Sequence, residues 1–591
     1  MNNIRNVAII AHVDHGKTTL VDALLRQSST KLGKEFTETS HLIMDNNDLE
    51  KERGITIFSK NASIIWKDIK INIIDTPGHA DFGGEVERVL KMADGCLLLI
   101  DAKEGPMPQT RFVLKRALEM KHKVIVVINK IDKADARIQE VLNKTFDLFL
   151  ELGADEETAY FPTVYCSSKL AKAGLEPDLD KMEDITPIFD AILEHIPAPT
   201  GSSDKPLQML ITSTVGDNFK GRIAVGRVYN GKLNAAQDVT WINRAGEMKK
   251  CHLTSLMTFS GLERLDTSEV QAGDICAIAG IPDITIGETI ADLKNPEALP
   301  LLDIEEPTIR MTVSVNASPF AGREGVYKTS RQIQERLYKE LETDVALQVE
   351  DTGGGWIISG RGELHLAILI ERMRREGYEF QVSRPQVIEK EIDGVIHTPI
   401  ESVSIEVPEE YSGAVMQKMG LRHGILQQMN SENGIVSMEF VIATKELFGY
   451  RSEFITATHG LGIINSAFLE YRKDTGGNFS RERGSLVVFE SGVTKLFGLL
   501  AAQGRGDLFI GPATQVYAGQ VIGSNAREDD IKINVCKEKQ QTNHRSAGEG
   551  VSEHFNVPEL MTLERALEYI VGADDEIVEV TPKNVRIRKT N

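Results

Sequence analysis

The stretch AIIAHVDHGKTTLVDALL, residues 8–25, decides how the N-terminal part of this chain folds. Its first half belongs to the run from Asn6 to Val13, which is short, apolar and rich in β-branched residues, as buried parallel strands are. Its second half, from Lys17 onward, carries apolar residues at helical spacing with few helix breakers. The sequence therefore predicts a strand, a tight turn at HGKTT and a helix.

Two kinds of binding site are compatible with that turn. His12 and His15 flank Asp14 and form a candidate metal-ligand cluster. Adjacent loop positions with one carboxylate and no cysteine make a poor zinc site, however. A strand-to-helix turn instead brings unpaired backbone N–H groups and the positive end of a helix dipole to one point, where anions bind. We therefore interpret the turn as a phosphate-binding loop.

The phosphate-loop interpretation gives each residue a task. Gly16 lets the backbone approach the phosphates, the Lys17 ammonium reaches the β and γ phosphates, and the Thr18 hydroxyl ligates Mg²⁺. The motif usually begins with glycine, whereas Ala11 stands there in this chain, so the motif taken alone is weak. The nucleotide-binding residues that we assign to the loop are Asp14, His15, Gly16, Lys17, Thr18 and Thr19.

A second apolar strand strengthens the interpretation. The stretch INIIDTPGHADF, residues 71–82, places Asp75 at the end of the strand, where its carboxylate can hold Mg²⁺ through a water molecule. Gly78 follows, and its N–H can face a γ-phosphate. The stretch ERGITI, which carries Thr56, lies between the phosphate loop and this strand.

A third strand predicts which base is bound. The stretch VIVVINKID ends in the four residues Asn129, Lys130, Ile131 and Asp132. The Asp132 carboxylate can accept two hydrogen bonds from N1 and N2 of guanine, whereas adenine lacks that donor pair and would leave the carboxylate unpaired. The later stretch YCSSKLA supplies Ser167 and Ser168 where the carbonyl oxygen of the base needs backbone N–H donors.

The motifs AHVDHGKTTL, ERGITI, DTPGHADF and NKID follow one another in this order and together resemble the G domain of translational GTPases. Two variants are distinctive of that family: the stretch Arg53-Gly54-Ile55-Thr56, and His79 directly after Asp-Thr-Pro-Gly. Family members often have alanine at the first loop position, which accounts for Ala11. Lys169 departs from the family, in which leucine is common at this position.

The resemblance implies roles that spacing alone does not assign. His79 occupies the catalytic position, where it orients the water that attacks the γ-phosphate. Val13 and Ile55 match the apolar gate through which this histidine moves, and Thr56 would complete the Mg²⁺ shell beside Thr18. The implied reaction is the hydrolysis of GTP to GDP and phosphate with Mg²⁺, and it depends on positioning and charge stabilisation more than on a strong base.

The chain beyond the G domain has the pattern of further modules. The stretch IPAPTGSSDKP, residues 196–206, is rich in Pro, Gly and Ser, as linkers are. Short β-branched runs follow, and RIAVGRVYNGKL predicts a hairpin that turns at Asn230-Gly231. We expect residues from about 207 to 300 to form a β-barrel like the second domain of elongation factors, closed by VQAGDICAIAGI, residues 270–281.

Two α+β modules are predicted next. PTIRMTVSV starts a β-α-β pattern that ends in RGELHLAILIERMRREGYEFQVSRP, and a second set of elements in the same order starts at ESVSIEVP. They resemble the third and fifth domains of a ribosomal translocase. Only residues 384–397 separate them, so the large translocase domain that reaches the decoding site is missing and full translocation is not expected.

The last part of the chain matches neither α+β type. The stretch RERGSLVVFESGVTKLFGLLAAQGRGDLFIGPATQVYAGQVIG resembles the start of the C-terminal domain of BipA/TypA GTPases. MDNNDLEKERGITI and SGRGELHLAILIERMRREGYE resemble the same family. The LepA-type factors share the domain order but end in a Lys-rich tail unlike this one. The resemblance to the BipA/TypA family covers essentially the whole chain.

A chain of 591 residues is too long for one hydrophobic core, so several domains are expected. The predicted fold class is a multidomain protein with α/β, β and α+β parts. Its expected modules are a P-loop GTPase domain (1–200), an elongation-factor-like β-barrel (201–304), two ferredoxin-like α+β domains (305–390 and 397–480) and a distinct C-terminal RNA-contacting domain (481–591).

Charge is distributed unevenly along the chain. The formal net charge of -20 and the pI near 5.3 argue against a coat of nucleic acid. Two segments are nevertheless basic: IKINVCKEKQQTNHRS, residues 531–546, and PKNVRIRKTN, residues 582–591. In BipA-type proteins the loop that corresponds to the first segment reaches the peptidyl-transferase side of the ribosomal A site and the acceptor end of tRNA. The candidate RNA-binding residues there are Lys537, Lys539, Thr542, Asn543 and Arg545, and a merely solvated loop is the alternative.

Bulk properties point to an ordinary protein of the cytoplasm. The chain is 41% hydrophobic and 26% charged, and no stretch approaches ~20 consecutive apolar residues, so no membrane partner is expected. The phosphate loop begins at residue 11, which leaves no room ahead of it for a signal peptide. Five scattered cysteines favour a reducing compartment. We expect a cytoplasmic monomer.

Three classes of function remain open from the sequence. The favoured one is a ribosome-binding, ribosome-stimulated GTPase that acts in assembly of the large ribosomal subunit and in stress adaptation of translation. Its partners would be guanine nucleotide and the ribosome, through rRNA and the acceptor end of A-site tRNA. A general elongation factor is the second class, and the missing decoding-site domain counts against it. A nucleotide-dependent scaffold without turnover is the third, although every chemical position of the site is filled.

Overall fold

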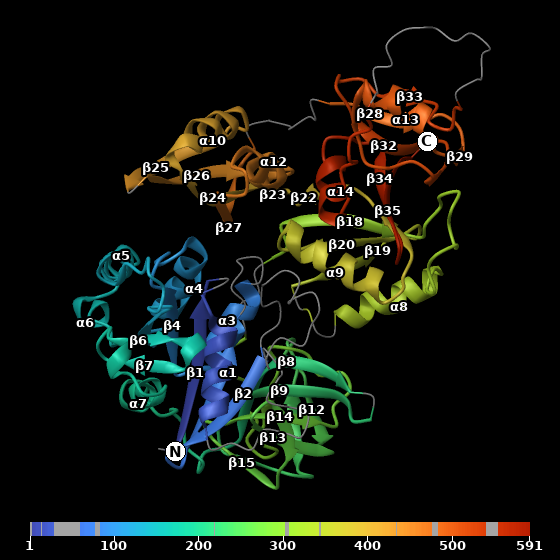
Figure 1. Cartoon of the computed structure of the whole chain (residues 1–591). Coiled ribbons are helices and arrows are strands. Elements are labelled where there is room, and N and C mark those ends of the chain that lie inside the picture. The colour runs from blue at the N-terminus through green and yellow to red at the C-terminus, as the bar shows by residue number, and fades with distance from the viewer. Residues whose placement is uncertain are drawn as a thin grey trace, which may run out of the picture. The chain divides into compact units, whose positions relative to one another are not determined.

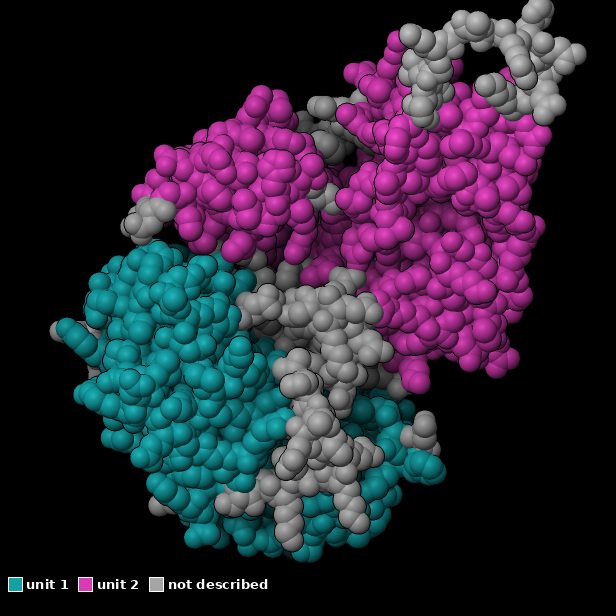
Figure 2. Space-filling view, viewed as in Figure 1, with its two compact units in different colours: residues 1–305 teal, residues 306–591 magenta. Residues whose placement is uncertain are grey.

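A computed structural model gives the fold of the chain. It describes residues 3–12, 15–28, 60–76, 83–217, 219–301, 306–341, 344, 346–432, 434–474, 483–538 and 554–590. The chain divides into two compact units, Met1–Glu305 and Glu306–Asn591, which Figure 2 shows in different colours. Many of the helices and strands of each unit are labelled in Figure 1.

The first unit begins with an α/β module. Its strands are β1 (Ile4–Ala11), β2 (Lys60–Trp66), β3 (Ile69–Asp75), β4 (Gly95–Asp101), β5 (Lys123–Asn129), β6 (Thr163–Ser167) and β7 (Lys172–Gly174). Their order in the sheet is β2-β3-β1-β4-β5-β6-β7. The strands from β3 to β6 along this order are parallel, and β2 and β7 run antiparallel at the two edges. β1, β3 and β5 confirm the three strands predicted for the nucleotide site.

Helices cover both faces of this sheet because successive side chains of a strand point to opposite faces. The helices are α1 (Lys17–Gln27), α3 (Gly83–Met92), α4 (Pro108–Glu119), α5 (Ile138–Glu151), α6 (Glu156–Ala159) and α7 (Thr186–His195), with short 3-10 helices η2 (Ser168–Leu170) and η3 (Leu179–Lys181). On β1, Ile10 packs in one core with Leu114 of α4, and Ile9 packs in the other with Leu24 of α1. β1 thus lies in the middle of the sheet, and its carboxyl end leads into the phosphate loop.

The second module of the first unit consists of strands. They are β8 (Gln208–Asp217), β9 (Gly221–Asn230), β10 (Lys232–Asn234), β11 (Asp238–Ile242), β12 (Met248–His252), β13 (Ser255–Ser260), β14 (Glu263–Asp266), β15 (Glu269–Gln271), β16 (Ile275–Ala279) and β17 (Thr289–Ala291). The main sheet has the order β12-β11-β17-β8-β9-β16-β13-β14. The stretch predicted to close the barrel forms β15 and β16, and β16 lies between β9 and β13.

The hairpin predicted at Asn230-Gly231 is wrong. β9 pairs with β8 and β16, whereas β10 pairs with β15 in a separate small sheet. Gly231 has a positive φ of 77°, and its N–H donates to the carbonyl of Ser202. A Cβ at this position would lie 2.6 Å from Cα of Leu207. The Asn-Gly pair therefore marks a positive-φ turn at which the chain changes sheets, and the two strands beside it do not face each other.

A buried polar network joins the α/β module to the β module within the first unit. Arg227 of β9 is 3% exposed and pairs with Asp94 at 2.6 Å. Asp274 accepts a hydrogen bond from Lys70 of β3 at 2.8 Å. Charges that lie this far from water need such partners, because an unpaired buried charge costs several kcal/mol. The network therefore fixes the two modules to each other in one geometry.

The second unit starts with a split β-α-β module. Its elements are β18 (Ile309–Ser314), α8 (Ser330–Glu340), β19 (Gln348–Asp351), β20 (Trp356–Gly360), α9 (Glu363–Arg375), β21 (Phe380–Val382) and the short β22 (Gln386–Val387). The order β19-β20-β18-β21 is fully antiparallel. This is the ferredoxin-like arrangement that the element order predicted.

A second module of the same kind follows. Its elements are β23 (Lys390–Ile392), β24 (Val395–Pro408), α10 (Glu409–Leu421), β25 (Ile425–Glu432), β26 (Ile435–Ala443), α11 (Thr444–Leu447), α12 (Tyr450–Ala457) and β27 (Ile463–Lys473). Its strands lie in the order β25-β26-β24-β27, again antiparallel, with β23 beside β24. Counted along each module, the two strand orders are identical.

The C-terminal elements extend the sheet of the first α+β module. They are β28 (Ser485–Val488), β29 (Gly492–Val493), α13 (Leu496–Gln503), β30 (Gly506–Leu508), β31 (Gln515–Val516), β32 (Gln520–Asn525), β33 (Ile531–Ile533), α14 (Leu563–Ile570), β34 (Glu576–Val580) and β35 (Val585–Lys589). β34 pairs with β21, so that Val578 lies opposite Val382, and the sheet continues through β35 and β32. One hydrophobic core includes Ile370 of α9 and Leu567 of α14. The second α+β module is therefore an insertion, in sequence, between two parts of one sheet.

Two buried carboxylates lie where these parts of the sheet meet. Glu579 of β34 is 0% exposed and accepts hydrogen bonds from the hydroxyls of Tyr517 and Ser318, at 2.8 and 2.9 Å. The amide of Asn316 donates to Glu579 at 3.0 Å and to Glu379 at 2.9 Å. These bonds replace the water that a carboxylate loses on burial. The joint between the two parts of the sheet is thus polar, and its buried carboxylates have hydrogen-bond donors.

Glu379, the second of these carboxylates, is also 0% exposed. It accepts backbone N–H bonds from Gly322 at 2.6 Å and Gly325 at 2.8 Å, both in the loop before α8. Burial by itself raises the pKa of the Glu379 carboxyl, but these N–H donors and Asn316 outweigh it, so that the pKa is lowered. Glu379 is therefore charged at neutral pH and holds this long loop in place.

The basic C-terminal tail, which the sequence marked as a second candidate RNA segment, uses most of its cations inside the fold. Arg586 pairs with Glu324 at 2.6 Å, and Arg588 donates to the side chain of Gln381 at 2.8 Å. A count of charges along the chain does not reveal these partners, because they come from distant segments.

Lys589, in the same tail, pairs with a cluster of three acidic side chains. Within the described ranges, one group of side chains is close enough to share a metal ion: Asp530, Asp575 and Glu576. The ammonium of Lys589 lies 2.9 Å from Asp575 and 3.1 Å from Glu576, and it also pairs with Asp530. Burial lowers the pKa of Lys589, but these carboxylates outweigh it and the pKa is raised. One cation of the chain itself thus pairs with all three carboxylates.

The five cysteines, all in described ranges, are free. Cys96, Cys166 and Cys276 are buried, and burial raises the pKa of the Cys166 thiol to about 12. Such a thiol stays protonated and unreactive at neutral pH. Of the helices that the structure describes, none combines the length and the apolar character needed to cross a bilayer.

Candidate nucleotide site

The predicted nucleotide-site residues that the structure describes gather at one edge of the α/β sheet. β3 ends at Asp75, β5 ends at Asn129 and β6 ends at Ser167, while β1 leads into the loop before α1. These strands are parallel, so their carboxyl ends meet at the same edge. This is the edge at which open α/β sheets bind ligands.

Part of the predicted site lies outside the described residues. These positions are Val13, Asp14, Ile55, Thr56, Gly78 and His79, together with Lys539, Thr542, Asn543 and Arg545 of the C-terminal loop. Their roles stay predictions.

Gly16 brings the phosphate loop against the end of β5. Its φ of 93° lies in the left-handed region, which glycine adopts without strain. A Cβ at this position would lie 2.5 Å from Nδ2 of Asn129. The same Nδ2 donates a hydrogen bond to the carbonyl of His15 at 2.7 Å. The phosphate loop and the predicted base-recognition turn are therefore bonded directly to each other.

The other end of the Asn129 side chain is held by the turn after β6. Its Oδ1 accepts hydrogen bonds from the N–H and the hydroxyl of Ser168, both at 2.9 Å, and from the Cys166 thiol at 3.3 Å. Ser167 accepts a bond from the N–H of Leu170 at 3.4 Å. The N–H of Ser168, which the sequence assigned to the base, is committed to Asn129 in this structure, so Ser168 supports Asn129 here.

Lys17 and Asp75 form a buried ion pair beside the loop. The Lys17 ammonium lies 2.8 Å from Oδ1 of Asp75 and also donates to the carbonyl of Thr76. The two side chains are only 9% and 2% exposed, so each requires a partner of opposite charge. The Asp75 carboxylate thus faces a cationic group at the place where the sequence predicts Mg²⁺.

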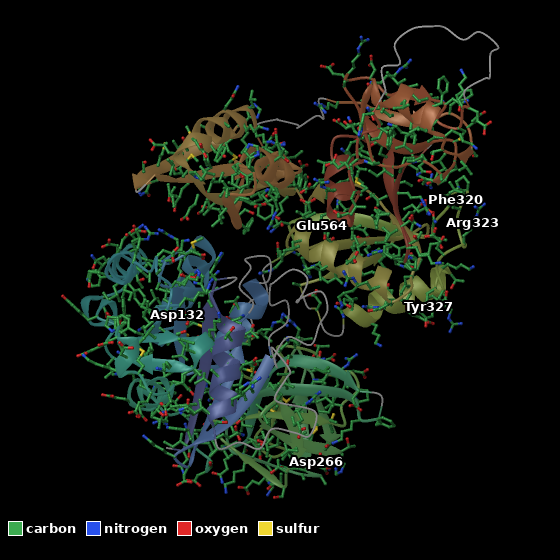
Figure 3. All side chains as sticks on the ribbon, viewed as in Figure 1. Asp132, Asp266, Phe320, Arg323, Tyr327 and Glu564 are labelled. Atoms are coloured by element: carbon green, nitrogen blue, oxygen red, sulfur yellow. The ribbon has the colours of Figure 1, made fainter. Side chains whose placement is uncertain are left out.

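Lys130 turns the chain at the end of β5. Its φ of 62° is left-handed, which is uncommon for a residue with a side chain. Its ammonium pairs with Oδ2 of Asp101, at the end of β4, at 2.7 Å. The next residue, Ile131, donates its N–H to the carbonyl of Cys166 at 3.4 Å. Asp132 follows with an exposed side chain, marked in Figure 3, so its carboxylate is open to a ligand.

His15 is completely buried beneath the loop. Nδ1 lies 3.3 Å from both the N–H of Asp101 and the carbonyl of Leu99, and Nε2 lies 3.4 Å from the carboxylate of Glu104. This contact with His15 lowers the pKa of Glu104. The rings of His12 and His15 meet edge-on, with their centroids 5.2 Å apart. Among the described residues, neither histidine belongs to a group of three or more potential metal ligands. Asp14, the third member of the candidate metal cluster, lies outside the described residues, so that alternative stays untested.

Sequence analysis missed Asp101 and Glu104. Both lie in DAKEG, directly after the buried strand GCLLLI, and the Asp101 side chain is 0% exposed. A carboxylate at the end of an apolar strand is the signal that identified Asp75, so the same rule could have found Asp101. Nothing in the sequence indicates that Glu104 reaches His15, because that pairing depends on the tertiary fold.

A phosphate loop between β1 and α1, a carboxylate at the end of β3 and an Asn-Lys-Ile-Asp turn after β5 define a P-loop domain that binds guanine nucleotide. Family models agree with this class. The Elongation factor Tu GTP binding domain matches residues 2–198, and Elongation factor Tu domain 2 matches residues 221–291. The Elongation factor G C-terminus matches residues 395–481, and the TypA/BipA C-terminal domain matches residues 483–591.

Curated relatives extend the match to the full chain. The large ribosomal subunit assembly factor BipA of Synechocystis sp. is 52% identical, over 99% of this chain and 98% of that protein. The proteins of the same name from Bacillus subtilis and Salmonella typhimurium are 48% and 49% identical, over 100% of this chain and 96% and 97% of theirs. The chain therefore belongs to the BipA/TypA family of translational GTPases, and its activity is the hydrolysis of GTP.

A solved structure shares the fold at lower identity. The crystal structure of a protein from Thermus thermophilus superposes with a TM-score of 0.56 at 18% sequence identity. The matched region covers 80% of this chain and 98% of the Thermus chain. Together with the family models, this likeness confirms the predicted multidomain fold class.

Proposed function

We propose that the protein is a ribosome-binding GTPase whose turnover is stimulated by the ribosome, and that it acts in assembly of the large ribosomal subunit and in stress adaptation of translation. The observation that carries the proposal is the full-length match to relatives named as large ribosomal subunit assembly factors, C-terminal module included. A translocating elongation factor is disfavoured, because only residues 384–397 connect the two α+β modules.

The loop from Asp14 to Thr19 would hold the phosphates of GTP. α1 begins at Lys17, so its unpaired N–H groups and positive dipole end face the loop. An incoming phosphate offers the Lys17 ammonium a second anionic partner besides Asp75. The ion pair of this structure would then be exchanged for a pair between Lys17 and the nucleotide, with Gly78 donating to the γ-phosphate.

Thr18 and Asp75 would hold Mg²⁺, with Thr56 completing the set. Hydroxyl and carboxylate oxygens are the ligands that Mg²⁺ prefers, and the buried Asp75 carboxylate already accommodates the cationic group of Lys17. When bound, Mg²⁺ neutralises charge that develops on the phosphates. The residues that are present therefore fit the ion.

Asp132 would recognise guanine through N1 and N2, supported by Asn129, Lys130 and Ile131 on one side and by the turn at Ser167 on the other. His79 would orient the attacking water once it passes the gate of Val13 and Ile55. A histidine that is held back until a partner moves it makes hydrolysis conditional on that partner. The ribosome is the partner that the family resemblance implies.

The C-terminal loop would contact RNA, namely rRNA and the acceptor end of A-site tRNA. Lys537 is exposed at the end of the segment that leads into this loop. Contacts of this kind weaken steeply with salt, because each neutralised phosphate releases counterions. We place the protein in the cytoplasm as a monomer.

GTP turnover with and without 70S ribosomes tests the proposal. We expect slow turnover of the protein alone, a large increase with ribosomes, and loss of that increase in His79→Ala with nucleotide binding retained. Equal turnover with and without ribosomes would contradict ribosome stimulation. Turnover that is undetectable under both conditions would favour the scaffold.

Base recognition has a separate test. Asp132→Asn should shift preference from guanine toward xanthine nucleotides, because the amide offers the base a donor in place of an acceptor. Competition between GDP and xanthosine diphosphate for a fluorescent nucleotide measures the shift. Retained guanine selectivity in this variant would refute the assignment of Asp132.

A further inference from the structure

We propose that Asp101, the last residue of β4, and Glu104, just after it, are positioning residues that hold the two ends of the nucleotide site in their relative places. Glu104 acts through His15 of the phosphate loop, and Asp101 acts through Lys130 of the base-recognition turn. The inference rests on the proposed placement of GTP in this site. Neither carboxylate is assigned a contact with the nucleotide.

Asp101 is a fully buried carboxylate with partners on both oxygens. Oδ2 lies 2.7 Å from the Lys130 ammonium and 3.5 Å from that of Lys133. Oδ1 accepts the N–H of Lys103 at 2.7 Å and that of Glu104 at 3.4 Å. Burial raises the pKa of the Asp101 carboxyl, but these partners outweigh it and the pKa is lowered. Asp101 is therefore charged at neutral pH and holds the Lys130 ammonium in an ion pair.

The conformation of Lys130 explains why this pairing matters. A side-chain-bearing residue at positive φ persists only where surrounding contacts determine it. Asp101 fixes the side chain, and the N–H of Ala102 donates to the carbonyl of Asn129 at 2.8 Å, which fixes the backbone before the turn. The direction in which the chain presents Asp132 thus depends on the segment that follows β4.

The same segment fixes the phosphate loop. The N–H of Asp101 donates to Nδ1 of His15, and Glu104 lies on the other side of the ring, at Nε2. The imidazole therefore contacts this segment on both sides, and its Nδ1 also lies 3.3 Å from the carbonyl of Leu99 on β4. The carbonyl of His15 in turn accepts the Asn129 amide, next to Gly16. Loss of the Glu104 charge would loosen the ring of His15 without removing the pair between Lys130 and Asp101.

Two diphosphates separate these effects. GDP carries the 2-amino group that Asp132 would read, and inosine diphosphate lacks it. In Asp101→Asn we expect about a tenfold loss of GDP affinity, the size of one charged hydrogen bond, and a clearly smaller loss for inosine diphosphate. In Glu104→Gln we expect an equal loss of about threefold for both, because Glu104 acts on the ring of His15 and leaves the pair between Lys130 and Asp101 in place. Titration calorimetry of the full chain measures all four constants.

A matched control exists in the same segment. Asp135 pairs with Lys103 at 2.7 Å, and both side chains are about half exposed. Asp135→Asn should leave both affinities unchanged, since exposed pairs contribute little. Far-UV circular dichroism on heating shows whether each variant is folded. If Asp101→Asn is not, Asp101→Glu replaces it, with a smaller loss that is again larger for GDP.

The outcomes distinguish this inference from the proposed site. A wild-type protein that binds GDP and inosine diphosphate equally contradicts the placement of Asp132 itself. A wild-type protein that prefers GDP, combined with wild-type affinities in Asp101→Asn, overturns the inference alone. Equal losses of both diphosphates in Asp101→Asn overturn the link to the base-recognition turn. A Glu104→Gln variant with unchanged affinities overturns the link to His15.

Discussion

The two α+β modules of the second unit share one strand order but differ at their edges. In the first module, β21 is paired along its length with β34, so the sheet continues into the C-terminal elements. In the second module, β25 lies at the edge of its sheet, and every side chain from residue 425 to 431 is exposed. One topology is thus used once as part of a larger sheet and once as a module that ends at its own edge strands.

The cores differ in the same way. The core of the first module includes residues from the C-terminal elements, such as Ala566 and Ile587, whereas the main core of the second module lies within residues 403–454. Damage to the first module should therefore spread into the C-terminal part of the chain, and damage to the second should stay local. The predictions that follow test this difference, from the largest effect to the smallest.

Phe380→Ala and Phe440→Ala form a matched pair with the largest expected effect. Phe380 on β21 is 0% exposed and Phe440 on β26 is 2% exposed, and truncation of a buried Phe costs about 3–5 kcal/mol. Phe380→Ala should raise amide hydrogen exchange in β34 and β35 as well as in its own module. Phe440→Ala should raise it only within residues 395–474. Unchanged exchange in β34 in the first variant would contradict the shared core.

Glu379→Gln should destabilise the joint by about 2–4 kcal/mol at neutral pH, because hydrogen bonds to a charged group contribute about 1.5–3 kcal/mol each. The pKa of Glu379 is lowered in the fold, where backbone N–H donors outweigh burial. Its contribution is therefore complete above the unfolded pKa of about 4.3 and is lost as the pH falls through the folded value. Urea unfolding across this range should show a smaller acid loss in the variant. Glu335→Gln, exposed on α8, is the control and should track the wild type.

Tyr517→Phe should have a smaller effect, about 1–3 kcal/mol, because it leaves the buried Glu579 carboxylate one donor short. The rest of the ring is unchanged, so packing stays the same. Tyr338→Phe on α8, where the side chain is 42% exposed, provides the control. Equal midpoints of urea unfolding for the two variants would show that the Tyr517 hydroxyl contributes nothing to the joint.

Leu426→Lys on β25 should have the smallest effect on stability, within about 0.5 kcal/mol, because the side chain is at the surface. A lysine on an exposed edge strand also opposes pairing with other chains, so light scattering at high protein concentration should fall or stay level. A loss of stability as large as that of Phe440→Ala would show that this edge is covered in solution.

Local patterns predicted most of the elements that build the nucleotide site. β1, β3 and β5 were recognisable because each is an apolar run that ends in a polar motif. The pairing of β21 with β34 was not recognisable, because periodicity shows which residues form a strand and not which distant strand lies beside it. The hairpin prediction at Asn230-Gly231 was wrong for the same reason. The turn itself was identified correctly, but the strands on its two sides pair with other strands.

The site shows the same division. Lys17, Asp75 and Asn129 were predicted by motif, and the structure brings them to one edge of the sheet. The pairs Lys130–Asp101 and His15–Glu104 could not be predicted, since each joins two segments that only the tertiary fold brings together. Likewise the charges of Arg586 and Arg588 were visible in the sequence, but their partners Glu324 and Gln381 were not.

The pairing of β21 with β34 has a consequence for how the chain is made. A ribosome delivers Phe380–Val382 long before Glu576–Val580, so the growing polypeptide must keep this strand edge unpaired while the whole inserted module emerges and folds. The sheet closes only when residues 576–589 have left the exit tunnel. A truncated product that lacks β34 and β35 would therefore combine a complete GTPase module with an incomplete sheet in the first α+β module. That incomplete sheet would be exposed to proteases and to chaperones.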